Sequence, residues 1–214
     1  MERILQQGLE TWGLPTDAIP RLQEFSRLLL EKNRVMNLTA ITDPADVARL
    51  HFLDCASLLT IADFPGKNVV DVGTGAGFPG MPLRLLEPDF DLTLLDSLGK
   101  RVDFLQETAQ AMDLKRIQCV HARAVAQLNI LCELALPLVK VGGQFLAMKS
   151  VDSDQEVQSA KSAIAQLGGK IGKIWDYTIP GTDIRHRVVI IQKQHPTPAA
   201  YPRPFARIKK APLG

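Results

Sequence analysis

The segment VVDVGTGAGFPG, residues 69–80, combines a carboxylate with closely spaced glycines. An apolar run leads to Asp71, and Gly73, Gly75 and Gly77 follow at alternate positions. Because glycine has no Cβ, such a turn lets the backbone bend sharply and approach a ligand closely. A carboxylate at the mouth of the turn suits the ammonium of an amino-acid ligand and repels a pyrophosphate. The segment therefore predicts a small-molecule site after a buried strand.

Two cofactors fit this glycine spacing. The pattern Asp-x-Gly-x-Gly-x-Gly is typical of an S-adenosylmethionine loop, but residues 75–80 also satisfy the dinucleotide fingerprint. Counted from the first turn glycine, Gly73, the nucleotide pattern needs a further glycine where this chain has Phe78. We therefore favour S-adenosylmethionine, with a nucleotide or a purely structural turn as alternatives. Asp96, at the end of the next apolar run, is placed to bind ribose hydroxyls, which both cofactors carry.

Apolar runs and helical periods alternate from residue 68 onward. We expect strands at 68–72, 90–96, 117–121 and 144–149, and helices at 82–87, 98–112, 124–140 and 151–167. Such alternation predicts a parallel sheet with helices on both faces. Two further runs, Lys170–Thr178 and His186–Lys193, have no helix between them and must pair antiparallel. The predicted fold class is α/β: a doubly wound, mostly parallel sheet of the Rossmann-like class I methyltransferase type, ending in an antiparallel hairpin.

The first part of the chain is predicted to be a helical cap, residues 1–64, before an α/β domain over residues 65–214. Pro65-Gly66 marks the boundary. We expect Asp17 to cap one amphipathic helix and Asp43-Pro44 to begin another. The proline-rich tail is expected to be extended and held by contacts.

Four side chains near these elements have two interpretations each. Asn37, between the two N-terminal helices, lines an active site or caps a helix. His51 and Asp54 face the pocket or, as we favour, form a surface or capping pair. Lys149 ends an inner strand at the carboxyl edge, where ligands bind in such sheets. It contacts RNA phosphate there or is simply exposed to solvent.

Charge is unevenly distributed, although the formal net charge is only +2. Asp183 is the last acidic residue, and the basic residues that follow it are Arg185, Arg187, Lys193, Arg203, Arg207, Lys209 and Lys210. This concentration is typical of a surface that meets phosphates, although a basic tail also serves solubility alone. The candidates for RNA contact are Arg185, Arg187 and Arg203, acting on phosphates without reading bases.

Composition restricts the class of protein. Hydrophobic residues make up 46% and charged residues 22%, as in a globular protein with a core. The three cysteines are widely spaced, which predicts buried free thiols in a reducing compartment. The first residues lack the apolar stretch of a secretory signal, and no run approaches the ~18 apolar residues that cross a bilayer. We expect a cytoplasmic monomer without a membrane segment or a metal site.

Several motifs together resemble one family. They are NLTAI (37–41), HFLD (51–54), DVGTGAGFPGMPL (71–83), LLDSLGKRVDFL (94–105), RAVAQL (123–128), RHRVVIIQK (185–193) and YPR (201–203). This set resembles the small-subunit rRNA methyltransferase G family, also called GidB, from about residue 20 to the C-terminus. The resemblance implies methylation of guanine N7 in 16S rRNA with S-adenosylmethionine, on the RNA or the small ribosomal subunit. It also implies that Gly73 and Phe78 contact the cofactor and that Asp96 binds its ribose.

The resemblance also implies a segment that this chain lacks. Family members have an Arg-Ala-Glu-Glu-like loop after the third strand, then a fourth strand that ends in Ser-Arg-Ala. Here HARAVAQL (121–128) passes from one Arg-Ala to the continuation of the other, so fifteen or more residues are absent. Arg123 and Ala124 match residues that contact the cofactor in the family, and they correspond to either of these two Arg-Ala motifs. Two explanations are open. Either residues 117–122 take the place of the fourth strand, which would break the right-handed crossover rule, or a segment has been omitted from the chain.

The chemistry that the resemblance implies needs few groups. N7 of guanine has a lone pair and no proton, so its methylation requires orientation and no general base. Asn37 and Lys149 are the candidates at the reacting centre. No cysteine follows a proline, which argues against methylation of a ring carbon through a thiolate. Two alternatives remain: a non-catalytic RNA-binding relative with a degenerate cofactor site, and a nicotinamide or small-molecule enzyme.

Overall fold

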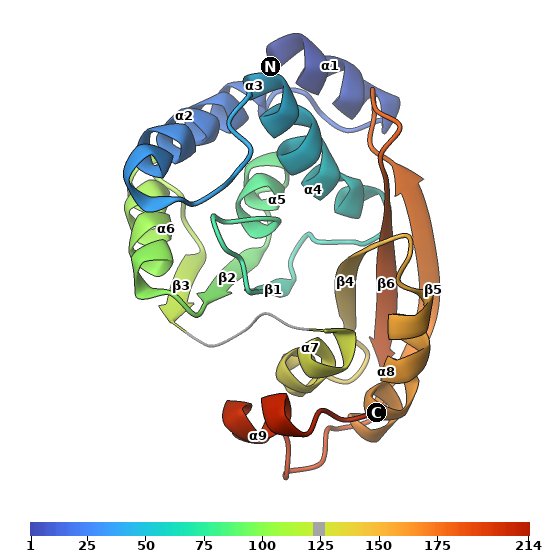
Figure 1. Ribbon diagram of the computed structural model, residues 1–214. Helices are drawn as coiled ribbons and strands as arrows, with labels where there is room; N and C mark the ends of the chain where they lie inside the picture. The colour runs from blue at the N-terminus through green and yellow to red at the C-terminus, as the bar shows by residue number, and fades with distance from the viewer. Residues whose placement is uncertain (122–126) are drawn as a thin grey trace. The chain divides into compact units, whose positions relative to one another are not determined.

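Figure 1 shows the computed structural model of the protein, which describes residues 1–121 and 127–214. Contacts divide the chain into two compact units: Met1–Arg123 with Ile179–Asp183, and Ala124–Thr178 with Ile184–Gly214. The described residues form one three-stranded sheet in each unit. The boundary expected at residue 65 lies inside the first unit, because the helices before it pack on helices of the α/β segment.

The first unit contains the predicted parallel strands. β1 (Asn68–Val72), β2 (Asp91–Asp96) and β3 (Ile117–His121) lie in the order β1-β2-β3, and both pairings are parallel. Between them, α5 (Gly80–Leu86) and α6 (Gly99–Ala111) connect one strand to the next and pack against the sheet. β3 lies beside β2, on the side away from β1. The interpretation in which residues 117–122 replace a fourth strand is therefore wrong.

Helices precede the sheet, as the sequence predicts. They are α1 (Glu2–Thr11), α2 (Ile19–Met36), α3 (Pro44–Asp46), a π-helix (Val47–Leu53), α4 (Asp54–Ala56) and a 3-10 turn (Ser57–Thr60). The Asp43 carboxylate accepts the amides of Ala45 and Asp46, which confirms that cap. The cap expected from Asp17 is wrong. Ala18 occupies the N-cap position of α2, so Asp17 lies one residue too early to cap it.

The second unit contains the predicted hairpin. β5 (Gly169–Thr178) and β6 (Arg185–Lys193) pair antiparallel, and β6 lies between β5 and β4 (Gln144–Ser150). β4 was expected in the parallel sheet, but among the described strands it pairs only with β6, antiparallel. The helices are α7 (Leu128–Ala135), α8 (Asp154–Gln166) and α9 (Phe205–Lys210), with a 3-10 turn at Leu136–Leu138. α9 corrects the expectation of a wholly extended tail, because Ile208 is buried and anchors a helical turn.

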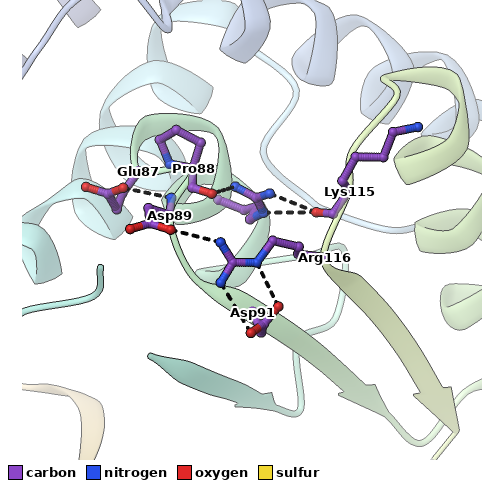
Figure 2. Close-up of polar contacts among 7 residues, drawn as sticks. Glu87, Pro88, Asp89, Asp91, Lys115 and Arg116 are labelled. Carbon is purple, nitrogen blue, oxygen red and sulfur yellow. Dashed lines mark hydrogen bonds and ion pairs between the residues drawn. The ribbon is translucent and has the colours of Figure 1, made fainter. Parts of the chain in front are cut away.

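Two arginines fix the amino ends of β2 and β3 (Figure 2). Arg84 of α5 is 6% exposed and donates to the carbonyls of Pro88 and Lys115. Arg116 donates to Asp89 and Asp91, with both N–O distances 2.8 Å. These contacts tie both strand starts to α5 and help to hold the register of the sheet. The opposite, carboxyl edge is where the glycine loop begins.

No helix in the described part of the chain is long and apolar enough to span a membrane.

Candidate functional site

The glycine loop follows β1 and is anchored to β2. The amides of Gly73 and Thr74 donate to the carbonyl of Leu95 at 2.8 and 3.0 Å. Gly75 has a φ of +59°, and a Cβ there would meet nothing within 4 Å. Its glycine is thus required by backbone conformation. Gly80 is required by close packing, because a Cβ there would lie 2.5 Å from Leu94 Cδ2.

Asp71 lies beneath the loop at the end of β1. Its Oδ2 accepts the Thr74 hydroxyl at 2.6 Å and the Gly80 amide at 2.9 Å. Burial raises the pKa of this carboxyl to about 6, against the two hydrogen bonds, which lower it. The charge of Asp96 adds a smaller rise. Asp71 is therefore predominantly ionised at pH 7 and protonated at pH 5.

Asp96 joins the two loops at the carboxyl edge of the sheet. Its side chain is 0% exposed; Oδ2 accepts the Gly75 amide at 2.8 Å and Oδ1 accepts the Leu98 amide at 2.9 Å. Arg101 Nη1 lies 3.6 Å from Oδ2. Asp71 pairs with Leu94 in the β1–β2 register. The predicted ribose ligand, Asp96, therefore lies at the same edge of the sheet as Asp71, which is predicted to bind the ammonium of the cofactor. In this conformation both oxygens of Asp96 already bind backbone amides.

Phe78 connects the loop to the N-terminal helices. Its ring stacks on the imidazole of His51, with centroids 4.2 Å apart and planes 12° from parallel. Phe25 and Phe52 contact the same ring at tilted angles. The surface or capping role that we favoured for His51 is therefore wrong, since its ring packs on the predicted cofactor loop. Burial lowers the pKa of His51, although the charge of Asp54 opposes this, so the ring is neutral at neutral pH.

The 37–41 loop is organised by a residue that sequence reasoning missed. Asn33 Oδ1 accepts the amides of Leu38 and Thr39, and its Nδ2 donates to the Thr39 carbonyl at 3.0 Å. Thr39 Oγ1 lies 2.9 Å from His51 Nε2, which links this loop to Phe78. Asn37 is exposed and adopts a left-handed conformation with φ 50°, at the C-cap of α2. The signal available for Asn33 was an asparagine shortly before this loop, since asparagine side chains often bind nearby backbone groups.

Lys149, in the second unit, is held by an acidic side chain. Its Nζ lies 2.7 Å from Glu156 Oε1, which also accepts the Leu128 amide at 2.5 Å. The Lys149 side chain is 15% exposed, so simple exposure to solvent is the wrong interpretation. A role for Lys149 at RNA phosphate stays a prediction.

The three arginines predicted to contact RNA differ in their surroundings. Arg187 binds Asp176 and Asp154, with N–O distances of 2.6 and 2.7 Å. Arg203 binds Glu133, whose side chain is 0% exposed, at 2.6 Å. The Arg185 side chain is 60% exposed, and its guanidinium lies 4.0 Å from Asp176. Arg187 and Arg203 thus stabilise the fold in this structure, and RNA contact by any of the three stays a prediction.

The other predicted residues divide between exposed, buried and undescribed positions. Arg207, Lys209 and Lys210 are exposed on α9. Arg123 and Ala124 lie outside the described residues. The three cysteines are free thiols; Cys55 and Cys132 are buried and Cys119 is half-buried, close to the prediction. Burial raises the pKa of Cys119 to about 11 and that of Cys132 to about 12, so neither is a thiolate at neutral pH.

Comparison with known proteins gives consistent matches. A model of the GidB family, described as rRNA small subunit methyltransferase G, matches residues 18–177. Proteins named ribosomal RNA small subunit methyltransferase G are similar over most of both chains. The Acetivibrio thermocellus protein is 39% identical, over 100% of this chain and 97% of its own length. The Alkaliphilus metalliredigens protein is 40% identical, over 98% of each.

Both of these alignments are longer than this chain. The one with the Acetivibrio thermocellus protein spans 235 positions, yet this chain contributes all of its 214 residues, so at least 21 positions have no counterpart here. The alignment length is consistent with an absent segment, and the place near Arg123 that we expect for it stays a prediction.

Solved structures share the fold. TrmN from Thermus thermophilus is 22% identical with a TM-score of 0.52, over 65% of this chain and 48% of that chain. A methyltransferase from Pyrococcus furiosus is 13% identical with a TM-score of 0.53, over 82% of this chain and 99% of that chain. The predicted class I methyltransferase fold is therefore confirmed.

Proposed function

This chain belongs to the rRNA small subunit methyltransferase G family, and from that premise we propose that it transfers a methyl group from S-adenosylmethionine to N7 of a guanine in 16S rRNA. The observation that carries the proposal is the carboxyl edge of the first sheet. There Asp71, the glycine loop and Asp96 come from two neighbouring strands and are joined by hydrogen bonds of 2.6–2.9 Å. Ligands of doubly wound sheets bind at this edge.

The residues at this edge suit the parts of the cofactor. Asp71 is anionic at neutral pH and matches the ammonium of the methionine moiety through a charge-assisted hydrogen bond. Both of its described bonds end on Oδ2, so we assign the ammonium to Oδ1. The positive-φ backbone of Gly73 and Gly75 lets a ligand approach without a Cβ in the way.

Asp96 is the proposed ribose ligand, and each of its carboxylate oxygens already accepts one backbone amide. A ribose hydroxyl has to share or replace the Gly75 amide that Asp96 Oδ2 now accepts at 2.8 Å. Gly75 has space to move, because a side chain there would meet nothing within 4 Å. We expect this hydrogen bond to weaken when the cofactor binds.

The reaction needs orientation more than acid–base chemistry. When bound, the cofactor would supply an electrophilic methyl group on a sulfonium. Guanine N7 would form the new bond to this carbon with its own lone pair, while the carbon–sulfur bond breaks and leaves a neutral thioether. No proton leaves N7, so the protein's task is to hold the base in line and to exclude water. Phe78 and His51 form an apolar wall beside the loop that suits this task. Arg185 and the exposed cations of α9 are the proposed phosphate contacts.

Calorimetric titration of the 214-residue chain with S-adenosylmethionine tests the cofactor part. We expect one-to-one binding that Asp71→Asn weakens by about tenfold or more, since a hydrogen bond to a charged group is worth ~1.5–3 kcal/mol. Asp113→Asn changes an exposed carboxylate and is the matched control.

Transfer of labelled methyl to 16S rRNA or small subunits, with chemical cleavage at 7-methylguanine, tests the target. Methylation of another atom would contradict the N7 assignment.

A second candidate is a non-catalytic RNA-binding relative. The observation that favours it is the 21 or more alignment positions that have no counterpart in this chain. It predicts retained binding of 16S rRNA with no measurable binding of S-adenosylmethionine. The titration above separates the two candidates.

A further inference from the structure

His51 belongs to a helical segment of unusual geometry. Val47–Leu53 is a π-helix, a form that is rare in proteins and often occurs at functional sites. In a straight α-helix, consecutive side chains point about 100° apart. Here the neighbours His51 and Phe52 both contact the ring of Phe78, with centroids 4.2 and 6.2 Å from it. The π-helix thus brings two consecutive rings to a single residue of the glycine loop.

A hydroxyl group also fixes the position of His51. Thr39 Oγ1 lies 2.9 Å from His51 Nε2 and accepts the Ile41 amide at 3.0 Å. Since this oxygen already accepts one proton, its own proton is available to a neutral imidazole that accepts at Nε2. Burial lowers the pKa of His51 and favours this neutral form. The imidazole is therefore held at one edge by Thr39 and on one face by Phe78.

Phe78 in turn belongs to a closed hydrogen-bonded turn within the glycine loop. The amides of Gly77 and Phe78 both donate to the Thr74 carbonyl at 2.9 Å. The Thr74 hydroxyl donates to Asp71 Oδ2 at 2.6 Å. A displacement of Phe78 would therefore disturb Thr74 and its bond to Asp71, the proposed ligand of the cofactor's ammonium.

We propose that His51 is a positioning residue for S-adenosylmethionine: held by Thr39, its imidazole fixes Phe78 and keeps the glycine loop in the conformation that binds the cofactor. The ligand in this inference rests on the proposed function. Where Phe78 is not held, the loop spends part of its time in other conformations. The apparent affinity then falls in proportion to the fraction of molecules that are competent to bind.

Amide hydrogen exchange without any ligand tests the positioning step. His51→Phe keeps a ring beside Phe78 but has no nitrogen for Thr39, and Thr39→Val removes the hydroxyl at nearly constant volume. In both variants the Phe78 amide should exchange about fivefold faster or more, as expected for the loss of one hydrogen bond. The Leu98 amide, which binds Asp96 in the neighbouring loop, should keep its rate. Unchanged exchange at Phe78 would overturn the proposal.

Calorimetric titration with S-adenosylmethionine tests the link to the cofactor, at a temperature where every variant is folded. His51→Phe and Thr39→Val should each weaken binding about fivefold at unchanged stoichiometry. The double variant should bind no more weakly than the single ones, because both substitutions remove the same bond. Additive losses in the double variant would overturn the proposal.

Two matched variants complete the titration. Thr39→Ser keeps the hydroxyl and should bind within about twofold of wild type. His195→Phe makes the same replacement at an exposed histidine of the second unit and should bind like wild type. A Thr39→Ser that binds as weakly as Thr39→Val would overturn the proposal, because the hydroxyl would then not be the group that matters.

The two readouts separate this inference from the proposed function. A wild type that binds no S-adenosylmethionine would contradict the proposed function, whereas faster Phe78 exchange in the variants would still show that His51 holds the loop. A wild type that binds the cofactor, with His51→Phe and Thr39→Val binding equally well, would overturn the positioning role and leave the proposed function standing.

Discussion

Asp71 makes stability depend on pH. Its pKa of about 6 in the folded chain exceeds the ordinary value of 3.8, so the folded state binds the proton more tightly than the unfolded state. The stabilisation is complete below pH 3.8 and is lost as pH rises through 6. Between pH 4 and 7 the wild type should lose about 1–2 kcal/mol relative to Asp71→Asn, allowing for solvent screening. Urea unfolding across this range checks it, and parallel curves for the two proteins would contradict it.

Gly80 is the residue where a single methyl group is expected to matter. A Cβ would lie 2.5 Å from Leu94 Cδ2 and 2.9 Å from Asp71 Oδ2. Gly80→Ala should therefore cost about 1–3 kcal/mol through overpacking. Gly99 also begins a helix, but a Cβ there would meet nothing within 4 Å. Gly99→Ala should stay within about 0.5 kcal/mol of wild type, and equal effects in denaturant unfolding would refute the packing argument.

The 37–41 loop depends on Asn33 more than on Asn37. Asn33 makes three hydrogen bonds to the backbone of this loop, whereas Asn37 is exposed and left-handed. Asn33→Ala should cost about 1–3 kcal/mol because it leaves loop amides unpaired. Asn37→Gly keeps the left-handed backbone and should be nearly neutral. Thermal unfolding of both variants distinguishes them, and a neutral Asn33→Ala would show that water replaces its side chain.

The C-terminal segment is attached to α7 by an ion pair. Arg203 binds Glu133, whose side chain is 0% exposed, so Arg203→Ala removes the cation and leaves the buried carboxylate with the backbone amide of residue 203 as its remaining donor from this segment. We expect a loss of about 3–5 kcal/mol in unfolding free energy. Arg185→Ala, at an exposed position, should change stability by less than about 0.5 kcal/mol and weaken RNA binding instead. A stable Arg203→Ala with reduced RNA affinity would reverse these roles.

The exposed positive charges of α9 are expected to contribute to RNA binding by the molecule as a whole. Replacing the exposed Arg207, Lys209 and Lys210 by serine should reduce the slope of log affinity against log salt by about 2, since each phosphate contact contributes ~0.7 on single-stranded RNA. Filter binding to 16S rRNA at several salt concentrations measures this slope. Lys67→Ser with Lys115→Ser is the control, since both lysines are exposed near the amino edge of the first sheet. An equal change in the control would mean that α9 has no special role.

The strands and the glycine loop were predictable because they depend on near neighbours in the chain. The predicted runs 68–72 and 117–121 match β1 and β3 residue for residue. Helix ends were less predictable, as the expected Asp17 cap shows, because a cap depends on the register in which the helix begins. Continuity of the sheet could not be predicted from local pattern, since β4 is as apolar as β1 and yet pairs with β6.

The sequence by itself determined the family, the α/β class and the loop from Asp71 to Gly80. Each of these follows from residue order and spacing. Only the tertiary structure decided which side chains meet. Thr39 meets His51, whose ring stacks on Phe78, and Glu133 meets Arg203 from 70 residues away. Such contacts depend on how packed elements approach one another, so local periodicity does not encode them.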